Sequence, residues 1–314
     1  MLLLSEDQTR DALPFPDLID ALAEMFRTGC EMPTRHHHDM EVPGEPDGTM
    51  LLMPAWLPGG FAGVKVVNVM PGNSKRDLPA VAAQYLLSDA RTGAMLALVD
   101  GGELTARRTA AASALAARYL ARSDARHLLV VGTGRLAANL VAAHMAVRPI
   151  EEVTIWGRSL EKAEALARDL RVRFPVAIQA AASLEDALGN ADIVSAATLS
   201  TEPLICGKAV KPGTHVDLVG AFKPTMRESD DDLIRRARIF VDTREGCLSE
   251  GGDIVQPLNS GVISKADVKA DLFELCRKEH PGRQSGEEIT LFKSVGAALE
   301  DLAGAILAYR NAER

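Results

Sequence analysis

The stretch HLLVVGTGRLAANL, residues 127–140, constrains the fold of this chain more than any other. An apolar run leads directly into Gly132-Thr133-Gly134-Arg135-Leu136-Ala137, and a helical pattern follows. This is a G-x-G-x-x-A turn, in which the glycines allow close backbone approach and the helix N-terminus attracts a pyrophosphate. A turn that binds no ligand can have the same sequence motif, but here the turn lies inside a β-α-β pattern. The stretch therefore predicts a dinucleotide site that includes Gly132, Thr133, Gly134, Arg135 and Leu136.

Short β-rich runs alternate with helical runs between about residues 123 and 259. The β-rich runs are residues 127–131, 151–156, 176–180, 191–197, 214–220 and 239–243. The helical runs are residues 135–147, 159–170, 183–188 and 230–238. The two neighbours at 191–197 and 214–220 both read as strands. Alternation of this kind is typical of a parallel sheet covered by helices. The predicted fold class is α/β, with a doubly wound Rossmann sheet.

The two ends of the chain read differently. A helix over residues 15–29 leads into β-type segments punctuated by proline and glycine, and a long alanine-rich helix follows at about 105–121. Residues 289–311 read as one more long helix with no strand after it. We expect this helix to pack on the N-terminal domain. The chain is thus predicted to form an α+β domain from residues 1–121 and 290–314 and a Rossmann domain from 122–289, with a ligand cleft between them.

Composition excludes some classes of function. Hydrophobic residues make up 47% of the 314 residues, charged residues 25% and aromatic residues 4%, and the net charge is −8. A nucleic-acid platform needs a basic groove and stacking rings, so we expect none. The N-terminal leucines are followed by acidic and polar residues, so neither a signal peptide nor a membrane span is expected. Four scattered cysteines favour thiols in a cytoplasmic protein.

The second strand of the Rossmann pattern ends in Gly157, Arg158 and Ser159. An enzyme that prefers NAD usually has an acidic residue here, which binds the ribose hydroxyls. A guanidinium and a hydroxyl suit a 2′-phosphate instead. The alternative is a solvated arginine at a turn. The triplet predicts that NADPH is preferred and that NADH is the second choice.

Three cations outside the Rossmann pattern suggest a local anion site. Arg35 lies in MPTRHHHDM, Lys65 lies in the apolar run GVKVVNV, and Arg108 lies on the alanine-rich helix. Because the overall charge is negative, an anionic substrate has to be attracted by a local group of this kind. A structural ion pair explains each cation taken alone. Together, beside a dinucleotide domain, they predict a carboxylate clamp.

The sequence predicts neither a metal site nor a nucleophile. His36, His37 and His38 are adjacent, so on a strand they would alternate between opposite faces. No carboxylate or cysteine pattern completes a metal site around them. A G-x-S-x-G turn is also missing from the sequence.

Eight segments, spread in order along nearly the whole chain, resemble the ornithine cyclodeaminase/μ-crystallin family. They are MPAW, GVKVVNVMPGN, LSDARTGAMLAL, LTARRTAAASALAARYLAR, VGTG, KPGTHVDLVG, EGGDI and ITLFKSVGAALEDLA. So many segments in one order make the resemblance specific. It implies a Rossmann domain together with a substrate and dimerisation domain built from both chain ends, and hence a homodimer.

The resemblance also implies roles for individual residues. Arg35, Lys65 and Arg108 are expected to hold a substrate carboxylate near the nicotinamide, with Lys65 as the catalytic residue. Met53, Ala80 and Phe222 are expected beside the substrate. The expected cofactor contacts are Arg108, Thr109, Gly132, Thr133, Gly134, Arg135, Leu136, Gly157, Arg158, Ser159, Thr198, Val219, Gly220, Ala221, Lys293 and Ser294.

Two departures separate this chain from the cyclodeaminases of that family. Those enzymes carry roughly G-x-D-x-P-G-x-x-E after the strand equivalent to 214–220, and here Phe222 stands at the aspartate position. Ala80 stands where they have a threonine near the substrate. Both departures remove polar groups that deamination would use. The chemistry that remains is hydride transfer to a preformed C=N bond, as in the Δ1-pyrroline-2-carboxylate (ketimine) reductases of the family.

We therefore expect reduction of a small cyclic imino acid by NADPH. Δ1-Pyrroline-2-carboxylate would give L-proline, and the six-membered Δ1-piperideine-2-carboxylate would give L-pipecolate. A protonated imine needs its carboxylate fixed and water excluded, and Lys65 can supply the proton. The alternatives are an ornithine cyclodeaminase, an alanine dehydrogenase of the same fold, and a non-catalytic NADPH-dependent binding protein of the μ-crystallin type.

Overall fold

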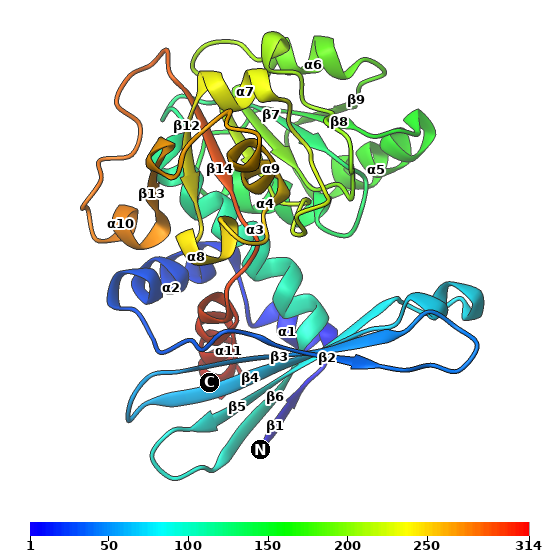
Figure 1. Cartoon of the computed structure of the whole chain (residues 1–314), viewed down its shortest axis with the longest axis vertical. Helices are drawn as coiled ribbons and strands as arrows, with labels where there is room; N and C mark the ends of the chain where they lie inside the picture. Colours follow the sequence, from blue (N-terminus) through cyan, green and yellow to red (C-terminus); the bar gives the residue numbers. More distant parts are fainter. Residues whose placement is uncertain (314) are drawn as a thin grey trace. The chain divides into compact units, whose positions relative to one another are not determined.

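The computed structural model describes residues 1–313, and the chain divides into two compact units (Figure 1). The first unit comprises Met1–Arg108 and Ala298–Arg314, and the second comprises Thr109–Ala297. The first unit is α+β and built from both chain ends, whereas the second has a parallel sheet. The predicted fold class is confirmed.

The second unit contains an eight-stranded sheet in which every neighbouring pair is parallel. Its strands are β7 (His127–Val131), β8 (Glu152–Trp156), β9 (Ala177–Ala180), β10 (Ile193–Ala196), β11 (His215–Leu218), β12 (Ala237–Val241), β13 (Val268–Asp271) and β14 (Ile289–Lys293). The order across the sheet is β13-β12-β14-β11-β10-β7-β8-β9. From β7 the chain first adds β8 and β9 on one side and then returns to add β10 on the other. This reversal is the switch point at which doubly wound sheets bind ligands.

Helices cover both faces of this sheet. They are α3 (Gly101–Leu120, which begins in the first unit), α4 (Ala137–Met145), α5 (Leu160–Arg173), α6 (Leu184–Asn190), α7 (Asp231–Arg236), α8 (Arg244–Cys247), α9 (Gly252–Asn259) and α10 (Leu272–Cys276). Leu128 and Val130 of β7 belong to a core cluster with residues of α3, α4 and α5. Leu129 and Val131 belong to a second cluster with residues of α6, α7 and α9. Because successive strand residues point to opposite faces, the two clusters lie on the two sides of the sheet.

The first unit contains a six-stranded sheet of order β1-β6-β5-β4-β3-β2. The strands are β1 (Leu2–Leu4), β2 (His36–Met40), β3 (Gly48–Trp56), β4 (Phe61–Val69), β5 (Val81–Asp89) and β6 (Met95–Asp100), and the helices are α1 (Glu6–Asp11), α2 (Phe15–Thr28) and α11 (Ala298–Ala312). Only β1 and β6 pair in parallel. As expected, the C-terminal helix α11 packs on N-terminal elements, namely α2 and strands β3 to β6.

The prediction of one helix over residues 289–311 was wrong for its first part. Residues 289–293 form β14, which lies between β11 and β12 and is buried along its whole length. A short run such as Ile-Thr-Leu-Phe-Lys, apolar without alternation, cannot be told from a buried helix by periodicity. Gly296 then adopts φ +82°, and helix α11 starts at Ala298. Among the described helices, none combines the length and apolar character that a bilayer crossing requires.

Candidate functional site

The turn between β7 and α4 has the geometry that the glycine motif predicts. Gly132 adopts φ +124°, and a Cβ added there would lie 2.8 Å from the carbonyl oxygen of Ala197. A Cβ added at Gly157, at the end of β8, would lie 2.7 Å from Cγ2 of Thr133. At Gly134, by contrast, an added Cβ would meet no atom within 4 Å. Gly132 and Gly157 are therefore needed for the turn itself, whereas Gly134 leaves free space that a bound pyrophosphate can use.

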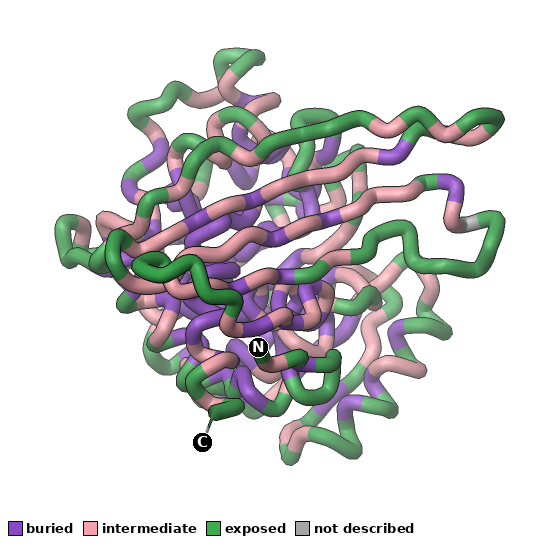
Figure 2. Tube along the Cα trace, turned by 90° about the horizontal axis from the view of Figure 1, so that it is seen from below, coloured by how far each residue is buried: buried purple, intermediate pink, exposed green. Residues whose placement is uncertain are grey.

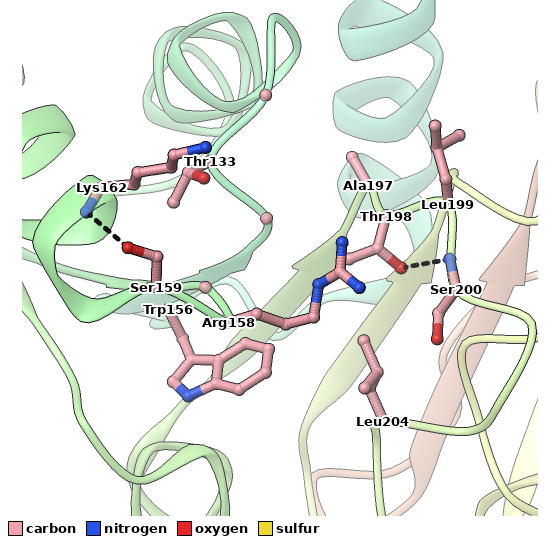
Figure 3. Close-up of a pocket in the computed structure, with 13 residues that line it drawn as sticks. Thr133, Trp156, Arg158, Ser159, Lys162, Ala197, Thr198, Leu199, Ser200 and Leu204 are labelled. Atoms are coloured by element: carbon pink, nitrogen blue, oxygen red, sulfur yellow. Dashed lines mark hydrogen bonds between the residues drawn. The ribbon is translucent and has the colours of Figure 1, made fainter.

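A cavity of about 460 Å³ lies beside this turn (Figure 3). Its walls come from the loops after β7, β8 and β10, at the carboxyl ends of strands that flank the switch point. Seven predicted cofactor residues line it: Gly132, Thr133, Gly134, Gly157, Arg158, Ser159 and Thr198. Six further lining residues were not predicted: Trp156, Lys162, Ala197, Leu199, Ser200 and Leu204. The residues fit a dinucleotide in position, backbone shape and charge.

The charged residues of the cavity wall are all basic. Figure 3 shows the Arg158 guanidinium pointing across the cavity towards Thr198. Lys162, in the first turn of α5, adds a second cation, and no lining residue carries a carboxylate. The Ser159 hydroxyl accepts a hydrogen bond from the Lys162 backbone N–H (3.3 Å) and so caps α5. Its own proton remains available to a ligand oxygen.

The remaining predicted cofactor residues do not line this cavity. Val219, Gly220 and Ala221 follow β11 and are buried. Gly220 packs tightly on Thr198, because an added Cβ would lie 1.8 Å from the Thr198 carbonyl oxygen. Lys293 and Ser294, at the end of β14, are buried as well. Arg135 and Leu136 immediately precede α4, with Arg135 exposed, and Arg108 and Thr109 lie on α3.

In the first unit, one row of residues crosses the sheet at Lys65. Met53 of β3 and Tyr85 of β5 are the direct neighbours of Lys65 of β4, and all three side chains are buried. Side chains directly opposite each other point to the same face. Met53 and Lys65 therefore lie in one row. Arg35 immediately precedes β2, whose first residue, His36, pairs with Leu52.

Two acidic residues of α11 join Lys65 to Arg108. Asp301 lies 2.7 Å through Oδ2 from Lys65 Nζ, and its Oδ1 accepts a hydrogen bond from Arg108 Nε (2.9 Å). Glu300 Oε2 accepts a hydrogen bond from Arg108 Nη1 (2.6 Å). Lys65 also donates to the hydroxyl of Thr105 (3.3 Å). The sequence did not predict Asp301, Glu300 or Thr105 as partners. Asp301 is 193 positions from Arg108, and a single sequence does not reveal contacts between such distant residues.

This network sets the charge state of Lys65. Burial lowers the pKa of Lys65 to about 8; the adjacent Asp301 carboxylate opposes this fall and the Arg108 guanidinium adds to it. Burial by itself would raise the pKa of Asp301, but Arg108 and Lys65 bring that pKa below its usual value. Near neutral pH the pair is therefore an ammonium beside a carboxylate. An ammonium with a pKa close to neutrality is suited to give a proton to a bound substrate.

Ala80 and Phe222, the other two residues predicted beside the substrate, do not belong to the row at Lys65. Ala80 is exposed and precedes β5, five residues from Tyr85, which is roughly 17 Å along the strand. Phe222 belongs to the second unit, in the loop after β11, and is 44% exposed. Residues 221–225 read Ala-Phe-Lys-Pro-Thr and contain no carboxylate. Within residues 1–313, no group of three or more histidine, cysteine or acidic side chains is placed to hold a metal ion.

Similar proteins carry related activities. A Δ1-pyrroline-2-carboxylate reductase of Paracoccus denitrificans is 43% identical over 300 residues, which cover 95% of this chain and 93% of that protein. The structure of a Thermococcus litoralis Δ1-pyrroline-2-carboxylate reductase in complex with NADH and L-proline is 36% identical, with a TM-score of 0.92 and coverage of 100% and 98%. An archaeal alanine dehydrogenase dimer with bound NAD is 32% identical, with a TM-score of 0.91 and coverage of 100% and 96%.

These likenesses extend over the whole chain rather than over the glycine motif alone. The sequence model of the ornithine cyclodeaminase/mu-crystallin family matches residues 3–314. That match spans both compact units, including the α11 residues that pair with Lys65 and Arg108. The chain belongs to the ornithine cyclodeaminase/mu-crystallin family.

Proposed function

We propose that this protein is an oxidoreductase that reduces cyclic ketimine acids, converting Δ1-pyrroline-2-carboxylate to L-proline and Δ1-piperideine-2-carboxylate to L-pipecolate. The observation that carries the proposal is the loop after β11, where residues 221–225 contain no carboxylate. By the family resemblance, Phe222 stands where cyclodeaminases carry an aspartate. The names of the Paracoccus and Thermococcus relatives support the same reaction. A bound reduced nicotinamide dinucleotide supplies the hydride that C2 of the imine accepts. The protein residues have to bind the acid, keep the nitrogen protonated and exclude water.

Unused hydrogen-bond donors of Lys65 and Arg108 support their role in holding the substrate carboxylate. An ammonium has three N–H donors, and Asp301 and Thr105 account for two of those on Lys65. The bonds of Arg108 to Asp301 and Glu300 use Nε and Nη1, which leaves Nη2 for a ligand. The acidic partners fix both cations in place, and preorganised donors lose little entropy when a carboxylate binds. Met53 of the same row and Arg35, which precedes β2, complete the proposed substrate group.

The charge balance of this network favours a zwitterionic substrate. Lys65 and Arg108 bring two positive groups, and Glu300 and Asp301 bring two acidic ones. A protonated cyclic imine acid carries one positive and one negative charge, so it leaves no uncompensated charge in a buried site. A 2-oxo acid would add a single negative charge. The third N–H of Lys65, shared between the substrate carboxylate and the nitrogen, then keeps the nitrogen protonated while C2 is reduced.

One alternative activity has a specific observation in its favour. The archaeal alanine dehydrogenase dimer matches the whole chain, and reductive amination of pyruvate would use the same two sites. Ornithine cyclodeamination is disfavoured because residues 221–225 provide no carboxylate. A substrate panel separates the three: the five- and six-membered imines, pyruvate with ammonia, and ornithine. The proposal is supported if NADPH is oxidised in the presence of the imines and of no other substrate in the panel. Ammonia release from ornithine would identify a cyclodeaminase instead, and reduction of pyruvate alone would identify an alanine dehydrogenase.

We further propose that NADPH is preferred over NADH. Arg158 and Ser159 were predicted to accept a 2′-phosphate, and Lys162 adds a second cation in the same cavity wall. The solved relatives bind NADH or NAD, so NADH is expected to serve as the weaker cofactor. The ratio of kcat/KM for NADPH to that for NADH tests this. Replacing Arg158 by alanine should lower the ratio at least tenfold, and an unchanged ratio would reject the assignment.

We also propose that the functional form is a homodimer in the cytoplasm and that the first unit provides both the substrate group and the dimer surface. Cross-strand neighbours build an apolar row on the sheet face opposite Lys65: Leu3, Leu98, Leu86, Val64 and Pro54. These residues are exposed or half-buried. Figure 2 shows the long strands as stretches of mostly exposed and intermediate residues. A contiguous apolar row at a surface is typical of an interface, and a relative forms a dimer. All four cysteines are free thiols, as a reducing compartment maintains them.

A further inference from the structure

Glu228 is the last residue of the stretch that begins at Gly220, and it has no role in the proposed reaction. Its side chain is fully buried in the second unit. The carboxylate accepts three hydrogen bonds from the ends of two neighbouring strands. Oε1 accepts from the backbone N–H (2.7 Å) and the hydroxyl (2.8 Å) of Thr198. Oε2 accepts from the backbone N–H of Gly220 (2.7 Å).

The two residues held by Glu228 shape the dinucleotide cavity. Thr198 follows β10 and lines the cavity (Figure 3), and its hydroxyl oxygen accepts a hydrogen bond from the N–H of Ser200 (3.3 Å), another lining residue. Gly220 follows β11 and packs directly behind Thr198, since an added Cβ would collide with Thr198 and lie 2.7 Å from Oε1 of Glu228. Movement of the carboxylate would therefore move the cavity wall.

The three donors together favour an ionised acceptor, because they occupy both oxygens of the carboxylate. A carboxylate accepts at both oxygens, whereas a protonated carboxyl group turns one oxygen into a donor that would face an N–H. The charged groups facing Glu228 are Lys293 on β14 and Asp253 on α9. Asp253 Oδ1 accepts from the Glu228 N–H (2.9 Å), and its Oδ2 lies 3.5 Å from Lys293 Nζ. Burial raises the pKa of Glu228 to about 7, with Lys293 opposing the rise and Asp253 adding to it.

We infer that the ionised Glu228 is a positioning residue for the dinucleotide, because it holds Thr198 and Gly220 in the arrangement that the cofactor binds. It acts through these residues and does not touch the cofactor. The inference rests on the proposed dinucleotide site but not on which imine is reduced. It assigns a role in cofactor affinity to a residue that does not line the cavity.

Direct binding measurements on Glu228→Gln test the role. The amide keeps the size of the side chain but replaces one acceptor oxygen by a donor. NADH and NADPH are titrated against tryptophan fluorescence, because Trp156 lines the cavity. We expect the Kd of both to rise about tenfold, with the KM of the imine nearly unchanged. Glu245→Gln on α8, where the side chain is exposed, is the matched control and should bind as the wild type does. Equal affinity in E228Q and E245Q overturns the inference.

The pH dependence of NADH binding gives a second test that needs no variant. NADH is the probe because it lacks the 2′-phosphate, which titrates in the same range. Affinity in the wild type should weaken as the pH falls through about 7, because Glu228 becomes protonated, and this dependence should be absent in E228Q. A flat wild-type profile between pH 6 and 8 overturns the inference even if E228Q does not fold. A wild type that binds no dinucleotide at all rejects the proposed cofactor site as well.

Discussion

Lys65 is the residue on which the proposed chemistry depends. It is buried in a strand, where it lies beside the Asp301 carboxylate and donates to the Thr105 hydroxyl. Replacing Lys65 by methionine should lower kcat/KM for the imine by roughly 10²- to 10⁴-fold and leave the Kd of NADPH unchanged. Steady-state kinetics and fluorescence titration measure the two effects. Lys75→Met, at an exposed position of the same unit, should behave as the wild type; full turnover in K65M would remove Lys65 from the mechanism.

The pKa of Lys65 predicts the alkaline limb of the pH profile. In the proposed mechanism Lys65 is an acid, so its protonated form should be the active one. With a pKa of about 8, kcat/KM should be level below that pH and fall tenfold per unit above it. The profile is measured with saturating NADPH. K65R cannot release a proton and should keep only residual activity, and because its guanidinium stays charged that residual activity should lack the limb. A wild-type limb that persists unchanged in K65R would assign the ionisation to the substrate or to another group.

At the level of single residues, sequence reasoning found the cations but not what holds them. A lysine in a run of valines points to a buried anion, and that signal was available. The anion itself, Asp301, lies on a helix at the other end of the chain. The sequence of that helix resembles the sequence of any amphipathic helix. Lys162 was missed for a similar reason: a lysine in the first turn of a helix is usually solvated, and only the folded β8–α5 turn places it in the cavity wall.

At the level of elements, the β7–α4 turn separates two roles for glycine. Gly132 is needed by the turn itself, whereas Gly134 has open space around an added Cβ. Gly134→Ala should leave the melting temperature within about 2 °C, because surface changes cost little, and weaken NADPH binding at least tenfold by crowding the pyrophosphate. Gly132→Ala should lower the melting temperature by several degrees. Calorimetry and fluorescence titration of the pair check this; equal effects on stability would contradict it.

Helices and strands whose apolar residues recur at a regular spacing could be predicted from the sequence. Buried strands without such a spacing could not. The strand–helix alternation from β7 to β12 follows from polar and apolar spacing and from turn residues. Strand β14 has no such spacing, since all five of its residues are buried between β11 and β12. Its neighbours in the sheet come from other parts of the chain. The apolar run alone therefore supports helix and strand equally well.

At the scale of the whole molecule, the apolar row on the open face of the first sheet predicts self-association. Leu86→Asp places a charge in the middle of that row, next to Val64 and Leu98. A charge buried in an interface without a partner costs several kcal/mol, so the variant should be monomeric at micromolar concentration. Light scattering after size exclusion measures the mass. Val172→Asp, at a highly exposed position on α5, should remain dimeric, and a dimeric L86D would place the interface elsewhere.

The most direct test of the central claim follows the hydrogen that reaches C2. The purified protein is given Δ1-pyrroline-2-carboxylate and NADPH deuterated at the transferable position of the nicotinamide, and the product is examined by mass spectrometry. We expect L-proline with one deuterium at C2, and we expect the amount of this product to equal the amount of oxidised cofactor. No proline at millimolar imine, or proline without deuterium at C2, would contradict hydride transfer to a preformed imine.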